Sequence, residues 1–183
     1  MKPIQTVYHG YRFRSRTEAR WALFFETMGF RWVYEEQGFV LDRNGCYLPD
    51  FRVTLPNEQE RYCEVQGEGD DDFDDTEMDK LREFADSSGT RVLHLTGLPD
   101  YRAYHQFIPG FGDALTLAFF QDYEPYVRTV DDYWLSSLRH DKRTGRAFFT
   151  HDQRGRRKSF GQGLVDAVTT ARHARFEHGE QPK

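Results

Sequence analysis

The chain has 183 residues, of which 38% are apolar and 30% charged, and its 16 Phe, 10 Tyr and 3 Trp supply bulk for a core. This composition predicts one compact domain rather than a disordered chain. No stretch reaches the roughly 18 to 20 apolar residues of a membrane span, residues 1–11 lack the apolar run of a signal peptide, and the two cysteines form no CxxC pair. We therefore expect a soluble cytoplasmic protein without a membrane partner.

The net charge of −5 conceals a strong segregation of charge along the chain. Residues 58–86 hold thirteen acidic residues against three basic ones, whereas residues 139–176 hold ten basic residues against three acidic ones. Because such segregation creates a local field, a polyanion can dock on the basic part despite the acidic average. The acidic run of residues 68–79 is interpreted as a solvated loop, with a DNA-mimicking surface as the alternative. It does not fit a calcium-binding EF-hand, because Asp75 stands where that loop requires glycine.

The first half of the chain predicts a helix followed by an antiparallel meander. Ser15 and Glu18 have the spacing of a capping box, and Gly29 is a natural stop, so we expect a helix over residues 15–28. Strand-like runs separated by turn residues then follow over residues 31–35, 38–41, 47–54 and 61–66.

The second half predicts fewer regular elements. A helix from residue 75 or 76 to 87 carries an apolar stripe, and residues 91–96 have the composition of a buried strand. Residues 97–112 contain two prolines and three glycines and predict a long loop. The remaining expected elements are a strand over 115–120, a short helix over 131–138, a basic hairpin of 145–151 with 158–160, and a final helix over 163–177.

Three acidic residues from separate elements are expected to converge. Side chains alternate along a strand, so Glu64 and Gln66 share one face of the 61–66 strand. If that strand pairs with the 47–54 run, Asp50 lies beside Glu64, and Glu18 on the inner face of the first helix points to the same place. Three carboxylates near a core resist ionisation together, and a hard cation such as Mg²⁺ removes the conflict. The alternatives are three separate surface acids, and for Glu18 a role in capping its helix.

These residues resemble the motif of the PD-(D/E)XK nuclease superfamily. Pro49-Asp50 looks like its first half, Glu64-Val65-Gln66 like its second, and Glu18 like the helix-borne acid of many branches. The resemblance covers residues 8–98, and the whole chain is similar to small nuclease-like proteins of phages and actinobacteria. It implies a restriction-endonuclease-like fold of the α/β (α+β) class, in which helices flank a central mixed sheet. The nuclease-like core would span residues 1–98, with a basic C-terminal extension over residues 99–183 packed on it.

The resemblance also implies an activity. A protein of this family hydrolyses phosphodiester bonds in DNA with Mg²⁺ or Mn²⁺. Asp50, Glu64 and the carbonyl of Val65 would hold the metal, and Glu18 would serve as an auxiliary acid. The expected function is therefore that of a Mg²⁺-dependent deoxyribonuclease.

One position departs from the family pattern. Gln66 stands where the family usually has lysine, so the side chain can orient water but brings no positive charge. Lys80, on the next expected helix, would then supply that charge. The departure also supports an alternative, a catalytically degenerate nuclease-fold protein that binds nucleic acid or inhibits a protein partner.

Two groups of basic residues are the candidate DNA contacts. Arginine and lysine bind phosphates along a strand and make affinity fall with salt. For the second group an ordinary solvated hairpin is the alternative, and the chain is compatible with a homodimer. The candidates are Arg14 and Arg16 near the acids, and Arg143, Arg146, Arg154, Arg156, Arg157 and Lys158 in the basic hairpin.

Overall fold

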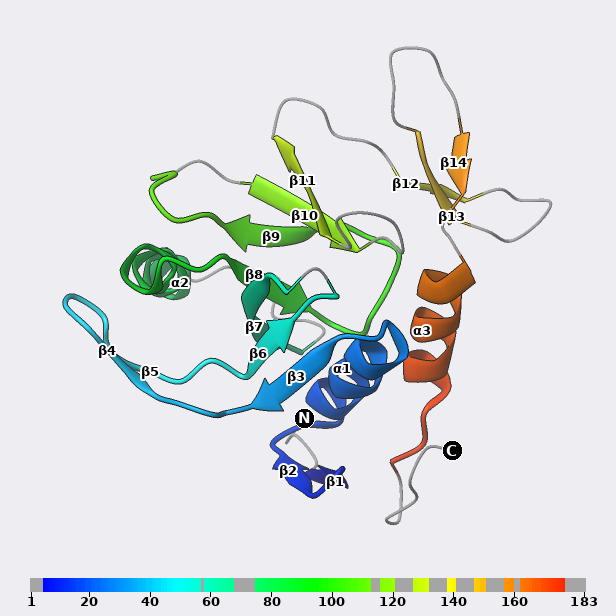
Figure 1. The fold of residues 1–183 in the computed structure, drawn as a ribbon, viewed down its shortest axis with the longest axis horizontal. Helices are drawn as coiled ribbons and strands as arrows, with labels where there is room; N and C mark the ends of the chain where they lie inside the picture. The colour runs from blue at the N-terminus through cyan, green and yellow to red at the C-terminus, as the bar shows by residue number, and fades with distance from the viewer. Residues whose placement is uncertain are drawn as a thin grey trace.

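The computed structural model describes residues 5–56, 58–67, 75–112, 116–120, 127–131, 138–140, 147–150, 157–159 and 162–176. In these residues a seven-stranded mixed sheet is flanked by helices, so the expected α+β class is confirmed (Figure 1). The sheet has the order β11 (Val127–Asp131), β10 (Thr116–Phe120), β9 (Tyr104–Phe107), β8 (Val92–Thr96), β7 (Glu60–Gln66), β6 (Phe51–Thr54) and β3 (Arg31–Tyr34). Strands β7 and β8 are parallel, and the other neighbours are antiparallel.

The helices lie where the capping signals place them. Helix α1 (Arg16–Thr27) begins after Ser15, whose side-chain oxygen accepts a hydrogen bond from the backbone N–H of Glu18 at 3.1 Å. Gly29 follows its end with a φ of 75°, a conformation that glycine adopts without strain. The other two are α2 (Asp75–Ser88) and α3 (Gln162–His173), both close to their expected ranges. None of the described helices has the length and apolar character needed to cross a membrane.

The sheet separates two hydrophobic cores. The larger one packs α1 and α3 on one face, with fully buried aromatic rings such as Trp21, Phe25 and Phe51. The smaller one packs α2 on the other face through Leu81 and Phe84. Burial of each large side chain contributes about 1.5–3 kcal/mol, so these two cores hold the sheet between its helices.

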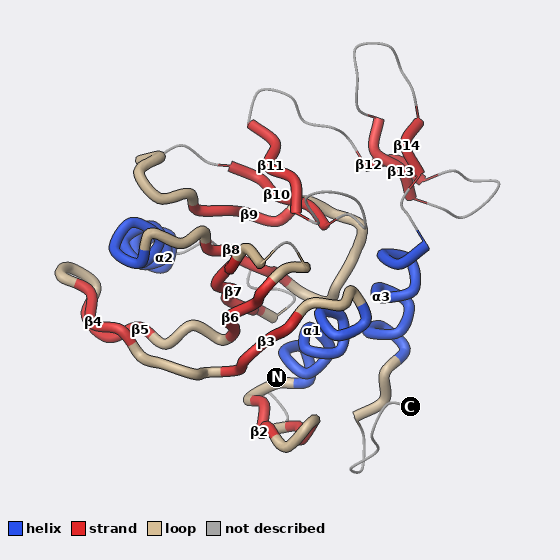
Figure 2. The backbone as a smooth tube through the Cα atoms, viewed as in Figure 1, coloured by secondary structure: helices blue, strands red, loops and turns tan. Residues whose placement is uncertain are grey.

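Two short hairpins lie outside the main sheet (Figure 2). They are β1 (Thr6–Tyr8) with β2 (Tyr11–Phe13), and β4 (Phe39–Leu41) with β5 (Gly45–Tyr47). The second hairpin packs against α2 and interrupts the meander between β3 and β6.

The continuous strand expected over residues 47–54 is wrong. It is divided into β5 and β6 by Leu48, Pro49 and Asp50. Pro49 has no backbone N–H to donate to a ladder. The side chain of Asp50, not its neighbour's backbone, takes the hydrogen bond from the β7 backbone at this point. Because of this break, Asp50 lies immediately before the first residue of β6.

The long loop expected over 97–112 is wrong, because it contains β9. Buried Gln106 and Phe107 pair with β8, and Tyr104 pairs with β10, despite the surrounding prolines and glycines. Of the helix expected over 131–138, residues 132–137 lie outside the described residues; Asp131 is the last residue of β11 and Leu138 is the first residue of β12 (Leu138–His140). The basic hairpin is present as β13 (Ala147–Thr150) and β14 (Arg157–Ser159), with β12 as its third strand. Strands β9 to β11, which follow residue 98, belong to the main sheet, whereas β12 to β14 form a separate three-stranded sheet.

Candidate functional site

Asp50, the residue immediately before β6, lies next to Glu64 of β7. Phe51 of β6 stands opposite Cys63 of β7, so one further step along each strand brings Asp50 across from Glu64. The backbone N–H of Val65 donates to Oδ2 of Asp50 at 2.8 Å. The predicted pairing of these two chain segments is therefore confirmed, and Asp50, only 3% exposed, is anchored to β7 by its own side chain.

Glu64 is held by a tyrosine from the β4–β5 hairpin. The hydroxyl of Tyr47 donates to Oε2 of Glu64 at 2.7 Å, and the Tyr47 ring packs on Phe84 of α2 with centroids 4.7 Å apart. Burial raises the pKa of Tyr47, and the negative charge of Glu64 raises it further. Tyr47 therefore stays protonated and keeps donating to the carboxylate. Sequence reasoning missed this residue, although its place two residues before Pro49 brings it close to the motif.

The two carboxyl groups resist being charged together. Burial raises the pKa of Asp50, the neighbouring charge of Glu64 adds to the rise, and the Val65 N–H opposes it. Burial also raises the pKa of Glu64, against the hydrogen bond from Tyr47. Two neighbouring acids with raised pKa values could bind a cation in exchange for protons. Carboxylate oxygens are the ligands that Mg²⁺ takes, usually one or two of them with several waters, so this pair fits such an ion.

Arg14 supplies part of the balancing charge. Its Nη2 donates to Oδ1 of Asp50 at 2.7 Å and also forms an ion pair with Glu35. Glu35 donates its backbone N–H to the carbonyl of Asp50 and has a φ of 44°, a conformation that costs a non-glycine residue about 1–2 kcal/mol. Arg14, expected to contact phosphates, is thus turned toward the acids, and strained Glu35 is a neighbour that no sequence signal indicated.

Glu18 lies in a capping position at the start of α1. Its Oε1 accepts from the hydroxyl of Ser15 at 2.8 Å. Its Oε2 accepts from the hydroxyl of Tyr34 at 2.5 Å and from the backbone N–H of Arg14 at 3.0 Å. Both oxygens are therefore committed to protein donors. The charge of Glu18 still contributes to raising the pKa of Asp50, so the acid is near the pair without belonging to it.

The expected metal site of three acids stays a prediction, and of these acids Asp50 and Glu64 lie closest together. Within the residues that the structure describes, no group of three or more His, Cys, Asp and Glu side chains is placed to hold a metal ion. Ser15 and Tyr34 hold Glu18 in its capping position, so a role of Glu18 as a ligand would require these hydrogen bonds to change.

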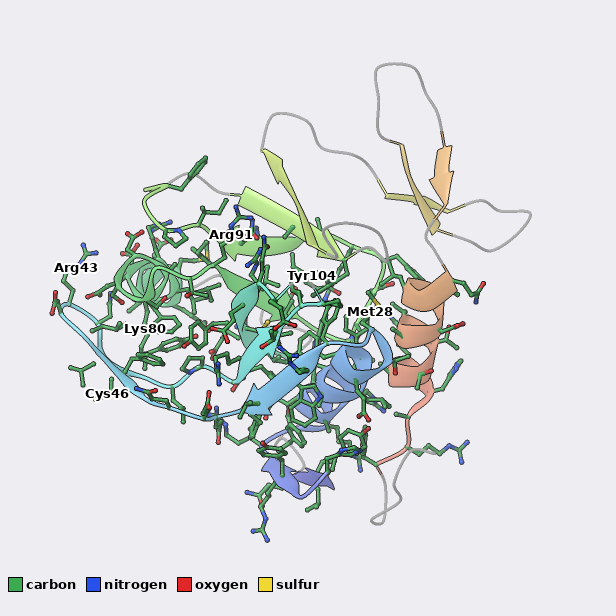
Figure 3. The ribbon with its side chains drawn as sticks, viewed as in Figure 1. Met28, Arg43, Cys46, Lys80, Arg91 and Tyr104 are labelled. Atoms are coloured by element: carbon green, nitrogen blue, oxygen red, sulfur yellow. The ribbon has the colours of Figure 1, made fainter. Side chains whose placement is uncertain are left out.

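Gln66 lies on the same strand as Glu64, and Lys80 lies on α2 near Tyr47. Gln66 ends β7 on the same face as Glu64, and its carbonyl accepts from the N–H of Gly97 at 2.7 Å. The Nζ of Lys80, on α2, lies 5.8 Å from the centroid of the Tyr47 ring. Figure 3 labels Lys80 on this helix and Cys46 on the adjacent hairpin. Lys80 is therefore next to the tyrosine that holds Glu64.

A buried histidine stands beside Glu64 in the sheet. His94 of β8 is the parallel-strand partner of Glu64 and is 1% exposed. Burial lowers the pKa of His94 to about 4, and the nearby charge of His105 contributes. His94 is therefore neutral at pH 7 and brings no positive charge to the two carboxyl groups.

The other candidate nucleic-acid contacts are placed only in part. Arg16 is the first residue of α1. Arg157 and Lys158 belong to β14, of which the backbone pairing with β13 is described. Four candidates lie outside the described residues: Arg143, Arg146, Arg154 and Arg156.

Comparison of the chain with protein-family models, with curated proteins and with solved structures gives no match. The arguments for function therefore rest on the geometry and electrostatics of the Asp50–Glu64 pair.

Proposed function

We propose that the chain is a cytoplasmic nuclease that uses Mg²⁺ or Mn²⁺ to hydrolyse phosphodiester bonds in DNA. The observation that carries this proposal is the pair formed by buried Asp50, just before β6, and partly buried Glu64 on β7, whose pKa values are both raised by burial. A purely structural role does not account for such a pair, because apolar side chains fill the same space without the cost of burying charge.

The proposed roles follow from what each side chain contacts. Asp50, Glu64 and the carbonyl of Val65 would hold the metal ion, which supplies Lewis acidity and lowers the pKa of a bound water. The N–H of Val65 and the hydroxyl of Tyr47 fix the two carboxylates at 2.8 and 2.7 Å respectively. These bonds orient the acids before any ligand arrives, which reduces reorganisation during the reaction.

Two further residues would act on the substrate side. Gln66 shares the face of Glu64 and can orient a water by donating from its amide group or accepting at its oxygen. Lys80 is a flexible cation beside Tyr47 and can move toward a phosphate whose charge grows in the transition state. Together they would orient water and supply positive charge, the two functions of the lysine that the Glu-X-Gln sequence lacks.

The test is cleavage by isosteric variants. Purified protein is incubated with supercoiled plasmid, single- and double-stranded oligonucleotides and RNA, in Mg²⁺, in Mn²⁺ and in EDTA. We expect metal-dependent nicking or degradation of DNA, reduced by a factor of at least about 100 in Asp50→Asn and in Glu64→Gln, because each removes a charged ligand. Glu58→Gln is the matched control, since Glu58 is an exposed acid paired with Arg31 at the surface.

Retention of activity in both isosteric variants contradicts the proposal, and so does a wild-type protein that leaves every substrate intact in both metals. Thermal unfolding of each variant shows that loss of activity is not loss of the fold.

A second candidate function is supported by one observation. Arg14 already neutralises part of the charge of Asp50 at 2.7 Å, as expected if the pair is no longer loaded with metal. In that case the chain is a degenerate nuclease-fold protein that binds nucleic acid or a protein. Binding of an oligonucleotide that persists in EDTA and in Asp50→Asn, with no cleavage, favours this candidate over the enzyme.

A further inference from the structure

Arg14 has a fixed backbone and a side chain that reaches solvent. Its backbone N–H donates to Oε2 of Glu18 at 3.0 Å and to the hydroxyl of Tyr34 at 3.2 Å. The preceding residue, Phe13, is fully buried in the larger core. The Arg14 side chain, in contrast, is 56% exposed. The fold therefore fixes where Arg14 stands, while its guanidinium group remains accessible to a ligand from solvent.

One nitrogen of this guanidinium contacts two carboxylates. Nη2 donates to Oδ1 of Asp50 at 2.7 Å and forms an ion pair with Glu35. The other oxygen of Asp50, Oδ2, accepts from the backbone N–H of Val65 at 2.8 Å. Both oxygens of this buried carboxylate thus have donors within the protein, and the donor at Oδ1 belongs to a half-exposed side chain.

The charge of Arg14 acts on both acids of the pair. Burial raises the pKa of Asp50 and of Glu64, and the positive charge of Arg14 opposes the rise at each of them. A cation held by these two carboxylates would therefore lie close to the guanidinium, and the two positive charges would repel each other. Binding of a cation thus weakens the attraction between Arg14 and Asp50.

A phosphate is a suitable second partner for Arg14. A planar guanidinium binds phosphate oxygens in pairs through charge-assisted hydrogen bonds, as it binds a carboxylate. In the proposed nuclease the scissile phosphate lies at the metal ion, next to a side chain that already contacts Asp50. Glu35, the other acid on Arg14, has a side chain that is 26% exposed, so water can reach it when the guanidinium turns away.

We propose that Arg14 exchanges Asp50 for a phosphate of the DNA strand when a cation binds Asp50. The cation then frees Arg14 for DNA, and the phosphate draws Arg14 away from the carboxylate that the cation needs. Metal and DNA therefore each raise the affinity of the protein for the other, by the same factor. The inference rests on the proposed function for its ligand, DNA, but it is tested by binding rather than by cleavage.

A double-mutant cycle tests the exchange without any metal. Asp50→Asn removes the negative charge that holds Arg14, as a bound cation would offset it. Binding of a short fluorescent DNA duplex to the full chain is measured by anisotropy in EDTA for the wild type, Arg14→Gln, Asp50→Asn and the double variant. We expect Arg14→Gln to weaken binding less than about twofold in the wild-type background and at least about fivefold in the Asp50→Asn background.

Two control variants separate the exchange from a general effect of charge. Arg12→Gln changes an exposed arginine of β2, and it should weaken binding by the same factor in both backgrounds. Glu64→Gln neutralises the neighbouring acid, which is bound by Tyr47, and it should tighten DNA binding less than Asp50→Asn does. This second comparison decides the result if Arg14→Gln fails to fold, which thermal unfolding reveals.

The same duplex in Mn²⁺ tests the coupling to metal. While a denaturing gel shows the duplex intact, Mn²⁺ is expected to tighten its binding at least about fivefold in the wild type and by a clearly smaller factor in Arg14→Gln. An equal factor in both proteins overturns the exchange.

The cycle in EDTA has outcomes that contradict the exchange independently of cleavage. Equal losses from Arg14→Gln in both backgrounds identify a constant phosphate contact, and no loss in either identifies a purely structural arginine. Either result, or a duplex that binds none of the four proteins, overturns the proposal. A fivefold difference between backgrounds supports the exchange even if the protein leaves DNA uncut, in which case only the proposed nuclease activity fails.

Discussion

The guanidinium of Arg14 donates to the carboxylate of Asp50 across 2.7 Å, so the most buried acid of the site already has a cation on one side. The same guanidinium pairs with Glu35, and the backbone N–H of Arg14 bonds to Glu18. Arg14 thus links the start of α1 to the end of β3 and to the entry of β6. A metal ion that binds Asp50 meets a positive charge already in place, and the two repel each other.

Arg14→Gln is therefore expected to change metal affinity and stability in opposite directions. Without metal, the variant leaves Asp50 poorly balanced and should lose about 1–2 kcal/mol, a value reduced by the solvent around this half-exposed side chain. With metal, half-maximal binding or activation should occur at a Mn²⁺ concentration several-fold lower than in the wild type. Calorimetric titration with Mn²⁺ measures the second effect, and an unchanged or weaker affinity contradicts it.

Glu64→Gln is expected to stabilise the protein while abolishing metal binding. The glutamine oxygen can still accept from the hydroxyl of Tyr47, but the partly buried negative charge beside Asp50 is gone. We expect a gain of about 1–2 kcal/mol in the free energy of unfolding at pH 8 in EDTA, as when a functional charge is removed. Urea unfolding measures it. Mg²⁺ should raise the stability of the wild type and leave the variant unchanged.

Variants of Ser15 and Glu18 distinguish a capping role of Glu18 from a role as a metal ligand. Ser15→Ala and Glu18→Gln are each expected to lose about 1 kcal/mol of stability, because each removes hydrogen bonds at the N-terminus of α1. Glu18→Gln should nevertheless bind Mn²⁺ within about threefold of the wild type, since its charge acts on Asp50 only from a distance. A loss of Mn²⁺ binding comparable to that of Asp50→Asn identifies Glu18 as a ligand instead.

The lowered pKa of Glu83 predicts how the stability of the fold changes with pH. Its two oxygens accept from the backbone N–H of Arg43 at 2.8 Å and from the side chain of Asn44 at 2.6 Å, fastening the β4–β5 turn to α2. The bond from the Arg43 N–H lowers the pKa of Glu83, so the folded chain holds this proton more weakly than the unfolded chain. Its stabilising effect is complete above the unfolded pKa and is lost as pH falls through the lower folded value.

Glu83→Gln should thus unfold at a lower temperature than the wild type at pH 7, with a difference that shrinks below about pH 4. Thermal unfolding from pH 3 to 7 measures it. Asp79→Asn, an exposed acid on the same helix, serves as the control. A difference that grows toward acidic pH contradicts the assignment.

Local signals explain what the sequence could predict. The capping box of Ser15 and Glu18 marked the start of α1, and Asn44-Gly45 marked the β4–β5 turn, where Gly45 has a φ of 70°. The pairing of β6 with β7 followed from two strand patterns joined by a short turn. Each of these depends on residues close in the chain, for which spacing carries the information.

The remaining features depend on contacts between distant residues. Strand β9 is fixed by its pairing with β8, and its buried Gln106 gives no apolar pattern to detect. The direction of Arg14 depends on Glu35 and Asp50, which are brought to it by folding. Likewise, the burial of Arg61 and its closeness to Arg91 result from folding, and no pattern in the sequence indicates them.

The packing of α1 against α3 has a consequence for how the chain folds during its synthesis. Trp21 and Phe25 belong to the same core as Leu164 and Val168, which are made some 140 residues later. A ribosome adding about 5–20 residues per second leaves the part of α1 that packs on α3 uncovered for many seconds. Closure of so long a loop is slow, so nascent chains should depend on chaperones until the last helix emerges.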